Sequence, residues 1–483
     1  MKTYDGMPVT GTAADLHAAY AQGMLTPCDA VELCLLAAHA TQSVFTCITA
    51  DRAREEARQS TARWRAGRTL GPLDGVPVTW KDLFDVRGTP TTAASALLMQ
   101  APPAAEDAAV VARASAAGMV CLGKTNLSEF AYSGLGLNPG FGTPVNHRLG
   151  ARSRVPGGSS SGAAMAVVHG CCPLAMGSDT AGSVRIPAAF NGLAGFRASR
   201  GRYPMQGVFP LAPSLDTLGP LAASVADCIA LDQVLCGLVP QSGARPGGAH
   251  AGSDGLRGQV FAVDSRLLQD DRIHARVRAN LLACLGLLQM QGARIEHRRL
   301  RSLQQMQALM ERHGWLGAHE ALATHRQRLD APDQAARMDP RVRLRLEAAR
   351  QLDHAAYLEL LAQRKPLMAL FAQELGEATL VLPTVGHPAP LLLPLLEDDT
   401  LFAETNLATL RLTMPGSFLD TPAVAMPSGT AQEMGPHGQP EPLPTSLQLM
   451  RPCGDDDRLL RTALCVEKAL FPSHSTVTGA RSA

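Results

Sequence analysis

An alternation of helical and strand-like segments between residues 105 and 200 constrains the fold more than any other feature of the sequence. Segments with the apolar spacing of helices alternate there with short apolar runs of strand length. Such alternation is typical of layered α/β proteins, so we predict an α/β fold with one sheet at its centre. The helical segments are residues 106–118, 160–170 and 184–192, and the strand-like segments are residues 119–123 and 173–179.

The remaining segments extend this pattern in both directions. Thr12 is predicted to begin a helix because Asp15 follows three positions later, and Gly23 to end it. Thr26 is predicted to begin a second helix because Pro27 suits the first helical turn. Further strands are expected at residues 44–50, 76–82, 259–264, 378–385, 422–427 and 446–450, and further helices at 51–67, from 265 to about 375, and at 456–470.

Composition and charge exclude several classes of protein. The 483 residues carry a formal net charge of +1 without a long run of one sign, so we expect no nucleic-acid partner. No stretch approaches the roughly 20 apolar residues of a membrane span, and the first residues lack the apolar core of a signal peptide. We therefore expect a cytoplasmic protein with no membrane partner. The eleven cysteines are scattered without a CxxC motif, so we expect neither disulfides nor a metal site.

Residues 118–125, GMVCLGKT, match the phosphate-binding pattern GxxxxGK[ST], with Lys124 as the phosphate ligand. A P-loop needs a strand before its first glycine and a loop in the four variable positions. Here a helical segment precedes, and Met119 to Leu122 are strand-like. Because a strand commits its N–H groups to a ladder, we reject nucleotide binding and expect a structural role for Lys124.

Residues 158–162, GSSSG, match the G-x-S-x-G nucleophile elbow of α/β-hydrolases, with Ser160 as the exposed serine. The elbow follows a buried strand, but the preceding residues ARSRVP contain two arginines and a proline. None of the fourteen histidines stands out as a catalytic base. We therefore reject a Ser-His-Asp triad at this position.

Residues 177–192, GSDTAGSVRIPAAFNG, place small residues before Ser183 and a helical segment after it. Small residues let the backbone approach a ligand closely, and their N–H groups can converge as an oxyanion hole. A tight strand-to-helix connection, in which Gly182 serves only the turn, accounts for the same residues. The local sequence leaves both interpretations open.

Lys81 lies at the end of the apolar run VPVTWKD, residues 76–82. A lysine can act as a base if burial lowers its pKa and keeps it neutral, and Val78, Trp80 and Phe84 make the setting apolar. On the local sequence alone, a solvated lysine or one paired with Asp82 is the favoured interpretation.

Three motifs occur in an order that resembles the amidase signature family, serine hydrolases of amide bonds. They are VPVTWKD (76–82), VPGGSSSGAA (155–164) and GSDTAGSVRIPAA (177–189), and the resemblance extends from about residue 10 to residue 470. It implies an amidase-signature fold, an α/β fold with a single large mixed β-sheet covered by helices on both faces.

The resemblance also implies roles for individual residues. Ser183 corresponds to the nucleophile, Lys81 to the base, and Ser159, 24 positions before Ser183, to a bridging serine preceded by a cis peptide bond. No cofactor and no metal are needed. The backbone N–H groups of Thr180, Ala181, Gly182 and Ser183 are expected to form the oxyanion hole, Ser178 and Asp179 to support this loop, and Arg185 to anchor the following helix.

Ala181 departs from the family, in which many relatives have glycine. A methyl group disfavours positive φ, so the loop must reach its geometry through allowed angles.

The resemblance implies a small amide, carbamate or urea-like molecule as the substrate, and it is compatible with a homodimer. Two alternatives stay open: the glutamine-hydrolysing component of a tRNA-dependent amidotransferase, and a non-catalytic binding protein on the same fold. Ile186 is apolar where the amidotransferase components usually carry glutamine, which disfavours the first. The substrate pocket is expected to include Tyr132, Ser133, Gly134, Leu135 and Ile186, and residues 383–420 of the second half.

We expect one amidase domain over residues 1–475. Its expected parts are a helical N-terminal part (1–70), a signature core (71–237), a Gly- and Pro-rich surface connection (238–257) and a second half (258–475), followed by a disordered tail at 476–483.

Overall fold

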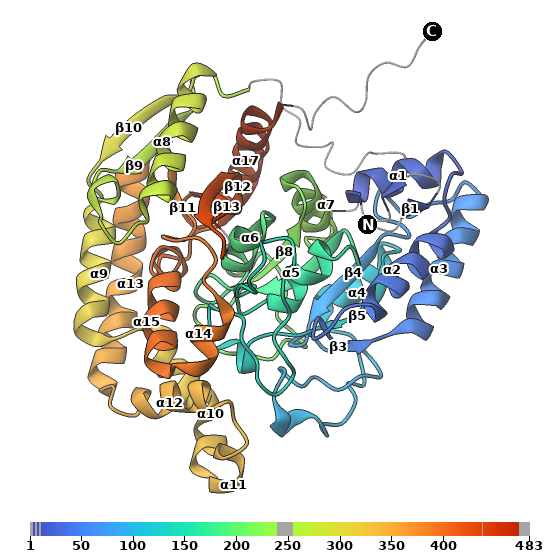
Figure 1. Ribbon diagram of the computed structural model, residues 1–483, viewed down its shortest axis with the longest axis horizontal. Helices are drawn as coiled ribbons and strands as arrows, with labels where there is room; N and C mark the ends of the chain where they lie inside the picture. Colours follow the sequence, from blue (N-terminus) through green and yellow to red (C-terminus); the bar gives the residue numbers. More distant parts are fainter. Residues whose placement is uncertain (1–2, 5–6, 9–10, 239–254, 437, 473–483) are drawn as a thin grey trace.

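The structure is a computed structural model and describes residues 3–4, 7–8, 11–238, 255–436 and 438–472 (Figure 1). Its helices are α1 Ala13–Ala21, α2 Pro27–His39, α3 Ala50–Arg65, α4 Ala109–Ala116, α5 Ser161–Val168, α6 Arg185–Asn191, α7 Val225–Leu235, α8 Ala275–Met290, α9 Arg301–His313, α10 Leu316–Asp330, α11 Pro332–Ala335, α12 Pro340–Ala349, α13 His354–Leu375, α14 Leu392–Glu397, α15 Asp399–Leu410, α16 Met414–Phe418 and α17 Asp456–Leu470. Short 3₁₀ turns are η1 Ala96–Leu98, η2 Glu129–Ala131 and η4 Leu267–Gln269.

The strands are β1 Thr3–Tyr4, β2 Met7–Pro8, β3 Phe45–Ile48, β4 Pro77–Lys81, β5 Val120–Thr125, β6 Leu174–Ser178, β7 Ala194–Arg197, β8 Leu218–Ala222, β9 Val260–Asp264, β10 Arg294–Arg298, β11 Thr379–Pro383, β12 Ala423–Met434 and β13 Pro440–Met450.

Helices α1 and α2 begin where side chains satisfy free backbone N–H groups. Thr12 Oγ1 accepts the N–H of Asp15 at 3.1 Å, and the Asp15 carboxylate accepts the N–H of Thr12 at 2.8 Å. Thr26 forms the same reciprocal arrangement at the start of α2. Gly23 follows the end of α1 with a φ of +67°. The predicted helix boundaries are therefore confirmed.

Strands β3 to β13 form one mixed sheet of eleven strands within the described residues, in the order β10-β9-β11-β13-β12-β7-β8-β6-β4-β5-β3. The runs β10-β9-β11 and β6-β4-β5 are parallel, and the other neighbouring strands are antiparallel. Strands of the first half of the chain occupy one end of the sheet and strands of the second half the other (Figure 1). The predicted α/β fold with a central mixed sheet is confirmed.

Helices cover both faces of this sheet. In β8, Leu218 and Ala222 pack into the apolar core that contains α7, whereas Leu221 packs into the one that contains α5. Successive side chains of a strand point to opposite faces, so each face of β8 has its own helical cover. A further apolar core holds α9, α10, α12 and α13 against β9 and β11.

Three strands of the eleven-stranded sheet were not predicted, for different reasons, and neither were the two-residue strands β1 and β2. Strand β7 has only four residues, and β8, LGPLA, contains a glycine and a proline that obscure a strand pattern. Strand β10, RIEHR, is an edge strand without a buried residue, so its sequence is polar. Most of the predicted connection, residues 239–254, and the predicted tail at 476–483 lie outside the described residues.

The apparent P-loop is a strand, as its sequence predicted. Strand β5 covers Val120–Thr125, and Lys124 is fully buried, with its Nζ 2.6 Å from the carboxylate of Asp82 and donating to Pro90 O at 2.8 Å. None of the eleven cysteines, which all lie within the described residues, forms a disulfide. Within the described ranges, no helix is both long enough and apolar enough to cross a bilayer.

Candidate active site

The sheet order brings together two of the three motifs. Strands β4 and β6 are parallel neighbours, so their carboxyl ends meet at the same edge of the sheet. Lys81 is the last residue of β4, and Ser178 is the last residue of β6. Ser183 follows five positions later, in the loop that leads into α6.

Lys81 is fully buried and contacts two serines. Its Nζ donates to Ser159 Oγ at 2.6 Å and to Ser178 Oγ at 2.9 Å. Burial lowers the pKa of Lys81 to about 7, although the charges of Asp179 and Asp216 oppose this shift. A substantial fraction of this lysine is therefore neutral near pH 7 and able to accept a proton.

The interpretation of Lys81 as the partner of Asp82 is wrong. The two residues are adjacent on an extended strand end, where successive side chains point in opposite directions. Asp82 instead pairs with Lys124 of β5 and accepts hydrogen bonds from Thr92.

Ser159 lies just before α5, and the peptide bond between Gly158 and Ser159 is cis, as the resemblance implied. A side chain at Gly158 would meet Gly136 N at 2.5 Å and Ser133 O at 2.8 Å, so only glycine allows this close packing. Ser160 N donates to Ser183 O at 3.2 Å, which ties the Ser159 segment to the Ser183 loop. Ser160 directly precedes α5 and Ser161 begins it, so the predicted start of this helix is confirmed.

Asp179 shapes the loop that carries Ser183. Its carboxylate accepts the N–H groups of Gly182 at 2.8 Å and Val184 at 3.2 Å. Burial opposes ionisation of Asp179, but the neighbouring Arg185 and Arg197 outweigh it and keep the pKa of Asp179 below its ordinary value. Asp179 therefore stays an anion, and its hydrogen bonds to Gly182 and Val184 stabilise the loop that carries Ser183.

The predicted oxyanion hole needs one correction. Because Gly182 N–H already donates to Asp179, it is not a free donor. The N–H groups of Thr180, Ala181 and Ser183 have no hydrogen-bond partner among the described residues, so three of the four expected donors are available. Ala181 does not have a positive φ, so its methyl group causes no backbone strain.

Arg185 anchors the loop to the second half of the chain. It pairs with Asp179 at 2.9 Å and donates to Gln448 Oε1 at 2.5 Å, and both charged side chains are fully buried. It also donates to Thr413 O at 3.1 Å and Ser417 Oγ at 2.9 Å. Arg185, two positions after Ser183, is thereby held by the residue that follows β6, by α16 and by β13.

Ser183 opens into a cavity of about 330 Å³. This is at the small end of the range of ligand pockets, so a small ligand fits best. Helices α12 and α15 and the start of α10 contribute about half of its lining residues. The lining residues are Ala131, Tyr132, Ser133, Thr180, Ala181, Ser183, Leu211, Trp315, Gly317, Ala318, Arg345, Ala348, Ala349, Leu352, Ala403, Asn406, Leu407, Leu410 and Met414.

The pocket residues expected from the sequence are only partly correct. Tyr132 and Ser133 line the cavity, and so do several residues within the expected range 383–420. Gly134, Leu135 and Ile186 do not line it. Leu135 and Ile186 are fully buried in an apolar core behind the wall, and Gly134 donates its N–H to Asn406.

The wall formed by residues 315–352 was missed. These residues belong to amphipathic helices whose pattern of apolar residues shows a buried face but not what that face encloses. Asp216 was also missed: it accepts a hydrogen bond from Thr180 Oγ1 at 2.6 Å and so orients the first residue of the donor loop. No local motif marks either feature.

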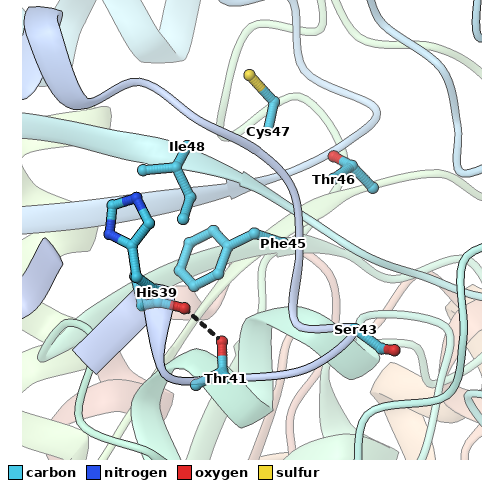
Figure 2. Close-up of a pocket in the computed structure, with 8 residues that line it drawn as sticks. His39, Thr41, Ser43, Phe45, Thr46, Cys47 and Ile48 are labelled. Carbon is cyan, nitrogen blue, oxygen red and sulfur yellow. Dashed lines mark hydrogen bonds between the residues drawn. The ribbon is translucent and has the colours of Figure 1, made fainter. Parts of the chain in front are cut away.

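A second cavity of similar volume lies at the sheet edge beside β3 and contains none of the predicted site residues. Figure 2 shows its lining, which comes from the end of α2, the loop that follows it and β3: Ala38, His39, Thr41, Ser43, Phe45, Thr46, Cys47 and Ile48.

The chain is similar to known proteins over most of its length. The family model described as Amidase matches residues 29–460. A 2-amino-5-chloromuconic acid deaminase of Comamonas testosteroni is 34% identical over 425 residues, covering 88% of each chain. A glutamyl-tRNA(Gln) amidotransferase component of Chloroflexus aurantiacus is 40% identical over 238 residues, 49% of this chain and 48% of that one. A crystal structure of an amidase superposes with a TM-score of 0.80 at 31% identity, covering 95% of this chain and 100% of that one.

The chain therefore belongs to the amidase family. Within that family it is an amide-hydrolysing enzyme, a hydrolase of C–N bonds.

Proposed function

We propose that this enzyme hydrolyses a small amide through an acyl-enzyme on Ser183, with Lys81 and Ser159 as its proton relay. The contact between Lys81 Nζ and Ser159 Oγ at 2.6 Å, made by a lysine whose pKa is lowered to about 7, carries this proposal. A serine hydroxyl is a weak nucleophile and needs such a base.

The proposed reaction first forms the acyl-enzyme on Ser183 and then hydrolyses it. Neutral Lys81 accepts the proton of Ser159 Oγ, which accepts the proton of Ser183 Oγ as that oxygen attacks the amide carbon. The carbonyl oxygen becomes an anion and accepts hydrogen bonds from the free N–H groups of Thr180, Ala181 and Ser183. Ser159 then gives a proton to the amide nitrogen and takes one back from the Lys81 ammonium, which becomes neutral again. The oxyanion returns to a carbonyl as the C–N bond breaks and the amine leaves. Water cleaves the ester on Ser183 by the same route.

The substrate is a small molecule with a primary amide, on two grounds. The cavity of about 330 Å³ suits a small acyl group better than a long one. The relative named as a deaminase supports ammonia as the leaving group.

The similarity to the amidotransferase component supports glutamine hydrolysis within a larger complex as a second candidate. That similarity spans about half of either chain. The two candidates differ in whether the purified chain alone releases ammonia from simple amides.

A fluorophosphonate probe tests the nucleophile. We expect the probe to lose fluoride and form one covalent adduct on Ser183, located by peptide mass spectrometry, because a polarised serine attacks phosphorus as it attacks a carbonyl. The Ser183→Ala variant should give no adduct. Ser161→Ala is the matched control, because the buried Ser161 Oγ has no hydrogen-bond partner among the described residues. An equal adduct on Ser183→Ala would refute the proposal.

The pH profile tests the base. Only neutral Lys81 can accept a proton, so kcat/KM should rise with pH and level off above a midpoint of about 7. The rise reflects loss of the Lys81 proton, and activity should fall tenfold per pH unit well below the midpoint. Ammonia release measured from pH 5 to 9 checks this, and a profile that is flat down to pH 5 would exclude Lys81 as the base.

A further inference from the structure

One cation lies in the wall of the cavity that contains Ser183. Arg345 of α12 is half-buried there, and its guanidinium lies 4.0 Å from the centre of the Tyr132 ring. Its Nη1 donates to Tyr132 O. Among the described residues it forms no ion pair, and no aspartate or glutamate lines the cavity. A guanidinium has five N–H donors, so most of the donors of Arg345 are left for a ligand.

Asn406 of α15 provides a second donor in the same wall. It is 4% exposed, and its Oδ1 accepts hydrogen bonds from Ser133 Oγ at 3.1 Å and from Gly134 N at 2.8 Å. These two bonds fix which way the amide faces, because both partners are donors. Its Nδ2 has no partner in the described part of the chain, and the residue lines the cavity.

Arg345 and Asn406 both form hydrogen bonds with the short segment 132–134. Arg345 is held by Tyr132, and Asn406 by Ser133 and Gly134. Both side chains therefore lie in the cavity wall beside residues 132–134, and no carboxylate of the described residues lines this cavity. The remaining lining is mainly apolar, and in such surroundings an unpaired cation favours an anionic ligand strongly.

We propose that Arg345 and Asn406 Nδ2 bind a carboxylate carried by the acyl group of the substrate. The enzyme then acts on acid amides, such as the monoamides of short dicarboxylic acids. This inference rests on the proposed function, since it assigns the acyl side of the Ser183 pocket. Planar guanidinium and carboxylate groups match in geometry, so Arg345 would also orient the amide carbon toward Ser183.

The test compares pairs of amides of equal chain length. The acidic members are succinic, glutaric and adipic monoamides, and the neutral members are butanamide, pentanamide and hexanamide. We expect the wild-type enzyme to prefer the acidic member of at least one pair by about tenfold or more in kcat/KM, measured as ammonia release. Equal rates on both members of every pair would overturn the inference.

Two substitutions assign the preference to Arg345. Arg345→Gln should lower kcat/KM for the acidic amide by about 10- to 100-fold, mainly through KM, and change the neutral amide less than threefold. Arg345→Lys should restore part of the preference, because it keeps the charge. Arg343→Gln is the matched control, since Arg343 lies on the same helix and does not line the cavity. Equal losses on acidic and neutral amides would show a structural role only and overturn the inference.

Failure of this inference is distinguishable from failure of the proposed function. Hydrolysis of neutral amides without a preference for acidic ones contradicts only the carboxylate site. Absence of hydrolysis for every amide, together with absence of a fluorophosphonate adduct on Ser183, contradicts both.

Discussion

Replacing Lys81 by methionine is expected to lower kcat/KM by about 10³- to 10⁴-fold, the range for loss of a general base that works with a nucleophile. Methionine has a similar length and fills the same space, but it cannot accept a proton. The Ser159 and Ser178 hydroxyls would each lose the donor that now lies within 2.9 Å. Ammonia release and fluorophosphonate labelling rates should fall together.

Stability should respond in the opposite direction to activity. Lys81 is fully buried without an ion-pair partner in the described ranges, so its ammonium form is unfavourable in the folded protein. Lys81→Met should therefore keep or raise the melting temperature. Lys124→Met is the matched control: Lys124 is equally buried but pairs with Asp82 at 2.6 Å, so its removal should destabilise the protein. A Lys81→Met enzyme that retains most of its activity would exclude Lys81 as the base.

Replacing Arg185 by methionine is expected to reduce the free energy of unfolding by about 3–5 kcal/mol, the usual loss when one partner of a buried pair is removed. The only cation left to pair with the Asp179 anion among the described residues would be the more distant Arg197, at 3.5 Å. Gln448 and Ser417 would lose their donor as well. Urea denaturation followed by circular dichroism measures this change.

Two variants test the cause of that loss. The double variant Asp179→Asn with Arg185→Met should be less destabilised than Arg185→Met alone, because no charge is left unpaired. Arg58→Met, which removes an exposed ion pair to Glu55, should leave the urea midpoint unchanged. A midpoint for Arg185→Met equal to that of the wild type would contradict the anchoring role.

The sequence predicted the strands and loops around the three motifs because local chemistry determines them. Short apolar runs indicated β4, β5 and β6, and the helical pattern of residues 160–170 indicated α5. The contact between Lys81 and Ser159 joins positions 78 residues apart, and only the resemblance to a family suggested it.

The pocket could not be predicted in the same way. Arg345 and Asn406 come from helices whose sequences show a buried face but not the neighbour of that face. Gly182 illustrates a related limit: the motif suggested its N–H as a donor, but which acceptor it finds depends on how the Asp179 side chain turns back into the loop. Strands β7, β8 and β10 were missed because tertiary pairing outweighs their weak local preference.

The proposed proton relay and most of the cavity wall come from separate parts of the chain. Lys81, Ser159 and Ser183 precede residue 184, whereas α10, α12 and α15 follow residue 315. Mutations in those helices can then redirect substrate choice while the reaction centre stays intact. This modularity makes the later helices, and Arg345 among them, the natural region to randomise when an altered substrate range is wanted.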